Sequence, residues 1–191
     1  MKLKLVSWIR EAHGKSGDTV FREVNGETIV ADRPGKRKGP LSEKQQEVQY
    51  RFTDARDFYR KVQLVPELLA MYEKAAEAAG KSVYMQCRRD WYSLPLVRGV
   101  EFQDYHGQVG GVIKFKVQDD ILAARAIVTL SDDEEGTLIE WGEAVREVEG
   151  TTFWMYTTTA AVPAGKLVAI QIAAFDYPGN MGRTSGVVHT R

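Results

Sequence analysis

The spacing of the hydrophobic positions changes at Pro95, from three or four residues before it to two residues after it. The first spacing is that of amphipathic helices, and the second is that of strands with one buried face. We therefore expect an α+β fold in which a small helical region, residues 41–95, precedes a β-sandwich, residues 96–191. Residues 1–40 follow neither pattern for long and are expected to form an N-terminal arm.

Three helices are predicted in the helical region. The first begins after Ser42, a typical N-cap residue, and runs to about Val65. Pro66 suits the first turn of the second helix, because the backbone N–H that proline lacks would be unpaired there in any case. Ser82 is expected to cap a third, shorter helix on which Cys87 faces the core. The apolar stripe of the first helix contains Val48, Phe52, Ala55, Tyr59 and Val62.

Asn25-Gly26 separates two β-rich runs of the arm, residues 19–24 and 27–30. This dipeptide predicts a β-hairpin, because a type I′ turn requires positive φ at both of its central positions. Both faces of such a hairpin carry apolar side chains, which two strands alone cannot cover. We therefore expect the hairpin to pack on its own chain or on a neighbouring molecule. The candidate contact residues are Val20, Phe21, Val24, Ile29 and Val30.

The segments that flank the hairpin are expected to be short or irregular. Residues 2–9 alternate well enough for a short strand or an extended arm, and residues 13–18 have the composition of a turn. Residues 33–40 form a linker whose two prolines and two glycines prevent regular structure. Its four cations are further candidates for contact with a partner: Arg33, Lys36, Arg37 and Lys38.

Seven short runs after Pro95 are rich in Val, Ile, Thr and aromatic residues and are separated by turn signals, which is typical of a seven-stranded β-sandwich. In the run from Phe153 to Tyr156, alternate residues must face opposite sides of the sheet. With Phe153 and Met155 in the core, Trp154 and Tyr156 point outward, where they would be anchors of a protein interface. The runs lie around residues 100–102, 112–117, 124–130, 138–141, 152–158, 168–174 and 186–189.

Five segments of the C-terminal half carry a family resemblance: Val117-Gln118-Asp119-Asp120 and residues 126–130, 153–157, 161–165 and 174–180. Through them this half resembles a bacterial immunoglobulin-like domain. The N-terminal half, with residues 14–21, the Asn-Gly hairpin and residues 40–46, resembles the start of uncharacterised bacterial proteins of unknown function. Immunoglobulin-like domains of this kind generally serve adhesion, spacing and assembly in surface structures, phage particles and filaments, so the resemblance implies a structural role.

The charges of the chain are divided between its two halves. Lys and Arg together number 26, as do Asp and Glu, but the segment up to Pro95 carries a net charge of +5 and the remainder −5. A chain without net charge is not drawn as a whole to nucleic acid or to an anionic membrane. No apolar run has the length of a membrane span or of a classical signal peptide. We expect extracellular or virion assembly by a non-classical route, or otherwise a cytoplasmic location.

The sequence indicates no catalytic residue, metal or cofactor. Gly14-Lys15-Ser16 matches the end of a phosphate-binding loop, but Ile9 stands where that motif needs a further glycine. The single cysteine excludes an internal disulfide. Acidic residues at 119–120, 132–135 and Asp176 could converge at one end of the sandwich and bind calcium, although turns use Asp in the same way without a metal.

These observations lead to one hypothesis and two alternatives. The hypothesis is a non-enzymatic structural subunit that self-assembles head to tail into a filament, fibre or virus-like or surface particle, through the hairpin arm and the immunoglobulin-like domain. The first alternative is a nucleic-acid-binding accessory protein, and the second is a surface-adhesion or carbohydrate-binding module. Nucleic-acid binding would use the basic linker together with the cations of the helices, Arg51, Arg56, Arg60, Lys61, Arg88 and Arg89.

Overall fold

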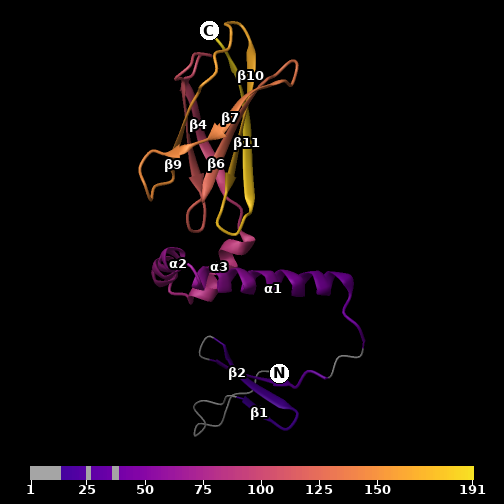
Figure 1. Cartoon of the computed structure of the whole chain (residues 1–191). Helices are drawn as coiled ribbons and strands as arrows, with labels where there is room; N and C mark the ends of the chain where they lie inside the picture. The colour runs from indigo at the N-terminus through magenta and orange to yellow at the C-terminus, as the bar shows by residue number, and fades with distance from the viewer. Residues whose placement is uncertain (1–13, 25–26, 36–38) are drawn as a thin grey trace. The chain divides into compact units, whose positions relative to one another are not determined.

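The computed structural model describes residues 14–24, 27–35 and 39–191 (Figure 1). The chain divides into two compact units, residues 1–46 and residues 47–191. The first unit contains a small β-sheet and the first four residues of the first helix, and the second contains the rest of the helices and the sandwich. The structure is therefore α+β, with two four-stranded antiparallel sheets in its larger unit.

The sheet of the first unit has the strand order β1-β2-β3. Strands β2 (Thr19–Val24) and β3 (Glu27–Asp32) form the hairpin, and Val24 pairs with Glu27 as the Asn-Gly turn predicts. The turn residues 25–26 and the possible strand at residues 2–9 lie outside the described residues. The turn expected over residues 13–18 is only partly correct. Gly17, with φ of 58°, reverses the chain so tightly that β1 (Gly14–Ser16) can pair with β2.

The three predicted helices are present as α1 (Glu43–Gln63), α2 (Pro66–Ala78) and α3 (Val83–Tyr92). Pro66 occupies the first turn of α2, and the Ser82 hydroxyl accepts a hydrogen bond of 3.3 Å from the Met85 N–H. A shared apolar cluster joins the helices and contains Phe58, Val62, Tyr72 and Cys87. None of the helices among the described residues is long and apolar enough to cross a membrane.

The stripe predicted for α1 is wrong in its first half. Val48 and Phe52 are 49% and 45% exposed, whereas Ala55, Phe58 and Val62 are buried. The difference follows from where the other helices pack: Phe58 contacts Tyr72 of α2 and Trp91 of α3, whereas Phe52 meets Tyr92 at the end of α3 and stays half exposed.

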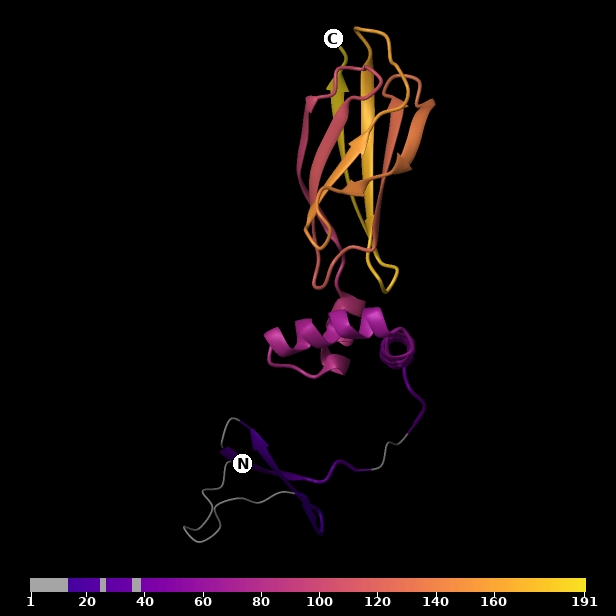
Figure 2. The same cartoon turned by 60° about the vertical axis from the view of Figure 1, so that its left-hand side comes forward.

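Eight strands form the sandwich, which Figures 1 and 2 show from two sides. Their orders in the two sheets are β4-β5-β9-β8 and β11-β10-β6-β7. The sequence predicts seven, because the two-residue strand β8 is too short to leave a pattern. The core takes alternate residues from both sheets, and these include the expected Ile113, Phe115 and Val117. The strands are β4 (Leu96–Asp104), β5 (Val112–Gln118), β6 (Arg125–Asp132), β7 (Leu138–Glu143), β8 (Val145–Arg146), β9 (Phe153–Thr157), β10 (Leu167–Phe175) and β11 (Met181–His189).

Gly182 and Pro95 approach each other where β11 meets the start of β4. A methyl group on Gly182 would overlap the Pro95 carbonyl oxygen. We expect Gly182→Ala to lower the free energy of unfolding of the sandwich by about 1–3 kcal/mol, because backbone must move to make room. Gly35→Ala is the control, since Gly35 has open space around it. Denaturant titration measures both, and an unchanged midpoint in Gly182→Ala would contradict this packing.

Candidate interaction surfaces

The hairpin sheet carries most of the predicted contact residues. Phe21 pairs with Val30 on one face, and Ile29 pairs with Arg22 on the other. The side chains of Val20, Phe21, Ile29 and Val30 are all partly exposed, so neither face is fully covered. Within the described residues β3 pairs only with β2, which leaves the backbone groups along its other edge open to a further strand. Val24 ends β2 in the predicted register.

The basic linker is described only in part. Arg33 is exposed, and its backbone N–H donates to the carbonyl oxygen of Asp18 at 2.5 Å, where the linker leaves the sheet. Lys36, Arg37 and Lys38 lie outside the described residues. Their part in an interface therefore stays a prediction.

Trp154 and Tyr156 are not on the surface, which corrects their prediction as outward anchors. Each is 5% exposed, while Phe153 is 51% exposed. The register between β5 and β9 explains the reversal, because Trp154 lies opposite Phe115 and Tyr156 opposite Ile113. Directly opposite residues share one face of a sheet, so the two buried β5 side chains carry their partners inward. Arg146 covers the Trp154 ring at 4.4 Å from its centroid.

The exposed part of α1 forms, with α3, a groove that sequence analysis missed. The guanidinium of Arg51 lies 4.9 Å from the centroid of the Tyr92 ring, and that of Arg88 lies 5.5 Å from that of Phe52. A hollow of about 310 Å³, which we call the helical groove, is lined by Arg51, Phe52 and Tyr92. Arg88 borders it through its contact with the Phe52 ring. Beside it, a second hollow of about 520 Å³ is lined by Lys81, Met85, Arg88, Arg89, Tyr92, Ser93 and Asp120.

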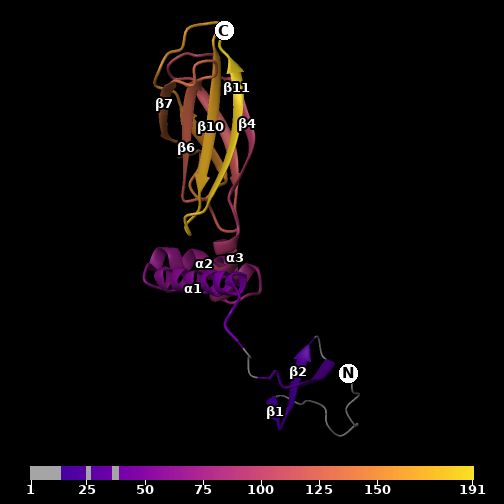
Figure 3. The ribbon, with the colours of Figure 1, turned by 90° about the vertical axis from the view of Figure 1, so that its right-hand side faces the viewer.

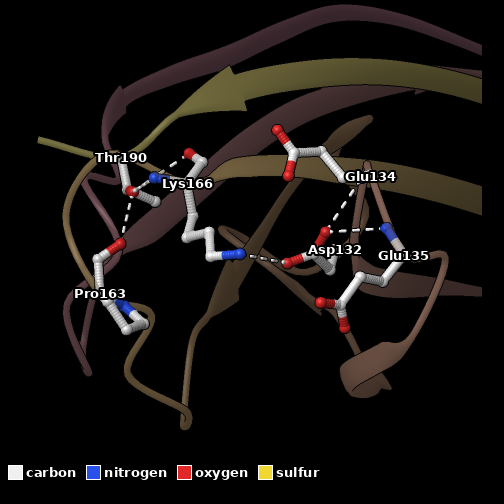
Figure 4. A network of polar contacts seen from close by, with 6 residues as sticks. All are labelled: Asp132, Glu134, Glu135, Pro163, Lys166 and Thr190. Carbon is white, nitrogen blue, oxygen red and sulfur yellow. Dashed lines mark hydrogen bonds and ion pairs between the residues drawn. The ribbon is translucent and has the colours of Figure 1, made fainter.

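The acidic residues at 119–120, 132–135 and 176, for which the sequence left convergence open, do not meet at one end of the sandwich. Asp119 and Asp176 lie near the helices, whereas the loop after β6 lies at the opposite strand ends. There Asp132 accepts hydrogen bonds from the N–H groups of Glu134 and Glu135 at 2.9 and 3.1 Å, and Lys166 pairs with it at 3.5 Å (Figure 4). These bonds shape a turn. Among residues 14–24, 27–35 and 39–191, no three acidic, His or Cys side chains form a group that could hold a metal.

A buried carboxyl cluster lies where α2 and α3 meet the sandwich. Asp90 is completely buried, and its Oδ2 accepts a hydrogen bond from the Tyr72 hydroxyl. Its Oδ1 has no hydrogen-bond partner among the described residues. Nearby, Asn180 donates to the Trp91 carbonyl at 3.2 Å, and Arg89 pairs with Asp120 at 2.9 Å. These contacts join α3 to the loops of the sandwich.

Burial raises the pKa of Asp90 to about 7, against the opposing effect of the hydrogen bond from Tyr72. The neighbouring carboxyls of Asp119 and Asp176 add to this rise. Burial likewise raises the pKa of Asp119 to about 6. Asp90 therefore titrates within the physiological range. Its position was detectable, since Val83, Cys87 and Asp90 recur at the i, i+4, i+7 spacing of one helix face.

Comparisons with known proteins give no family. No protein-family model matches the chain, and no curated protein matches its sequence. Among solved structures, CopC from Methylosinus trichosporium OB3b is 10% identical, with 49% of this chain and 89% of that chain covered and a TM-score of 0.37. A lipoprotein from Bacteroides thetaiotaomicron is 14% identical, with 52% and 82% covered and a TM-score of 0.29. Likeness at this level does not bear on function.

The raised pKa of Asp90 makes stability depend on pH. Between about pH 4 and pH 7 this carboxyl is protonated in the folded chain and ionised in the unfolded chain, so the free energy of unfolding falls as pH rises. The loss reaches at most about 4 kcal/mol. We expect Asp90→Asn to flatten this fall, and Asp54→Asn, on an exposed part of α1, to keep it. Denaturant titrations across this range test it, and equal slopes for Asp90→Asn and wild type would contradict it.

Proposed function

We propose that this protein is a non-enzymatic structural subunit that assembles with further copies of itself into a filament, fibre or particle. The observation that carries the proposal is the hairpin sheet. It exposes apolar side chains on both faces, and β3 has a free edge among the described residues. Such a sheet gains backbone hydrogen bonds and buries apolar area when it adds to the sheet edge of another molecule.

The receiving element in this proposal is an edge strand of the sandwich of the next copy. Both sandwich sheets are open, and within the described residues they end in β4, β8, β7 and β11. A contact between an arm and a sandwich edge joins two different surfaces, so it repeats from copy to copy instead of closing at two. The division of charge favours the same head-to-tail contact. The segment up to Pro95, with a net charge of +5, attracts the remainder of another copy, with a net charge of −5, as the two molecules meet.

We further propose that the sandwich is immunoglobulin-like. One sheet has the order β4-β5-β9-β8 and the other β11-β10-β6-β7. Named A to G in chain order, with β7 as C′, these orders correspond to A-B-E-D and G-F-C-C′, the arrangement of immunoglobulin-type sandwiches. Many cell-surface domains share this sandwich architecture, which is compatible with a role in assembly.

The double variant Phe21→Asp with Val30→Asp tests the assembly. The two residues face each other across the hairpin, so two carboxylates would have to be desolvated in the contact. We expect light scattering to fall to the level of the unassembled protein and polymers to vanish from negative-stain micrographs. Ser16→Asp, on an exposed position of β1, is the control and should leave assembly intact. Unchanged assembly of the double variant would refute the proposal, as would a wild type that never polymerises.

The helical groove favours a second candidate function, the binding of single-stranded nucleic acid. Phe52 and Tyr92 are 45% and 37% exposed, and arginines already lie against both rings. Aromatic rings beside guanidinium groups are the combination on which bases stack and phosphates pair. This surface is independent of the basic linker, on which the sequence-based alternative chiefly depends.

Arg51→Glu with Arg88→Glu tests the second candidate. If the groove binds nucleic acid, wild type should shift a single-stranded oligonucleotide at low salt and release it steeply as salt rises. The double variant should lose at least about tenfold in affinity, because two phosphate contacts become repulsive. Arg60→Glu is the control on α1, where Arg60 is occupied with Asp57 at 3.1 Å. No shift by wild type at low salt would eliminate this function.

A further inference from the structure

The outward side of sheet β11-β10-β6-β7 is free of charge over its centre. Figure 3 presents this sheet with its strands side by side. The register aligns its outward residues in rows that cross all four strands, and two of these rows contain no ionisable side chain. They are Trp141, Thr129, Gln171 and Ser185 in one row, and Leu138, Ser131, Ala169 and Val187 in the next. We call these two rows the uncharged face.

Three large apolar side chains of the uncharged face are open to solvent. Trp141, Leu138 and Val187 are 62%, 61% and 54% exposed. Trp141 and Leu138 stand on the edge strand β7, and Val187 on the opposite edge strand β11. A contiguous surface with exposed tryptophan and no charge is typical of a protein interface and unusual for a solvated sheet.

The other sheet provides an internal comparison, because its outward side is charged. Its central strand β5 presents Lys114 and Lys116, which pair with Glu101 and Arg98 of β4. Phe153 is exposed there too, but it lies beside Lys116, whose ammonium is 5.5 Å from the ring centroid. One sheet thus has the surface expected for contact with water and the other does not.

We propose that the uncharged face pairs with the same face of a second copy of this chain. A surface without charge can meet itself without repulsion, whereas the lysine-bearing sheet would repel its own copy. The whole outward side of the sheet takes part in this contact, with the uncharged face at its middle. Four strands about 4.8 Å apart, with about seven residues each, span on the order of 450 Å² in projection. Such a contact is smaller than the roughly 800 Å² per partner of a standard interface, which suits a reversible dimer.

The rim of the face supports a twofold pairing. The row beside the uncharged face runs from Glu143 on β7 to Arg183 on β11, with Ile127 and Ala173 between them. A twofold axis parallel to the strands places β7 of one copy over β11 of the other. Glu143 then meets Arg183 of the second copy at both edges, although in its own chain it already lies 3.8 Å from Arg125. A middle without charge and opposite charges at the rim are the usual anatomy of an interface.

This contact goes beyond the proposed function. It uses none of the hairpin residues, and it closes at two copies, whereas the hairpin contact repeats. The test is therefore made in the full chain carrying Phe21→Asp and Val30→Asp, in which hairpin-dependent polymers are absent. A dimer that persists in this background supports the proposal, even if the wild type forms no filament.

The experiment is sedimentation velocity over a concentration series. In the hairpin-variant background we expect a reversible dimer, and Trp141→Glu should weaken it at least about tenfold, because Trp at a buried contact is a frequent hot spot. Phe153→Glu is the matched control, since it places the same charge at a comparably exposed position of the other sheet. Its dimer should be unchanged. Thermal unfolding checks that both variants are folded.

The rim gives a second, independent measurement. Glu143→Arg alone and Arg183→Glu alone should each weaken the dimer, and the two substitutions together should restore it, because the exchange recreates opposite charges across the axis. A strictly monomeric protein would overturn the proposal. Equal weakening by Phe153→Glu and Trp141→Glu, or a double rim variant weaker than either single one, would overturn it as well.

Discussion

Because side chains alternate along a strand, the pairing of β5 with β9 and of β6 with β10 decides what the sandwich buries and what it offers to partners. Phe115 opposite Trp154 places Trp154 and Tyr156 of β9 in the core and Phe153 outside it. In the other sheet, Val128 lies opposite Ile172 and both are buried, so the neighbouring residues Thr129 and Gln171 face outward. A slip of one residue would exchange these sets, so the buried aromatic pairs and the uncharged face result from the same constraint.

The buried carboxyl of Asp90 plays a comparable role between the helices and the sandwich. A hydrogen bond from Tyr72 on α2 and the contact of Asn180 with the end of α3 fix one arrangement of these elements. Desolvation of a carboxyl opposes folding, and protonation limits that cost. Since its pKa is about 7, the strength of this junction depends on pH in a way that the apolar core of the sandwich does not. The two halves of the larger unit therefore differ in what holds them together.

Local signals account for the elements that the sequence predicts correctly. Ser82, Pro66 and the Asn-Gly dipeptide act within a few residues, so the helix boundaries and the hairpin register could be derived from them. The sequence could not decide which residues around Trp154 face the core. All of them are large and apolar, so either alternate set could be the buried one. Phe52 was misplaced because its burial depends on where α2 and α3 pack against α1, and this contact is made by elements that follow later in the sequence. The uncharged face needed the register of four strands that are far apart in sequence.

The two contacts that we propose, through the hairpin and through the uncharged face, differ in symmetry, and their combination defines the kind of assembly proposed. A contact that joins different surfaces extends a single row of copies, and a twofold contact joins each copy to one partner only. As proposed, the two contacts together give a doubled row in which each interior copy has two partners along the row and one across the twofold axis. The proposed face contact has no ionisable side chain in its two central rows, so salt affects its stability little, whereas encounter guided by the +5 and −5 halves is screened by salt. Pairing of copies and growth of the row thus respond differently to ionic strength.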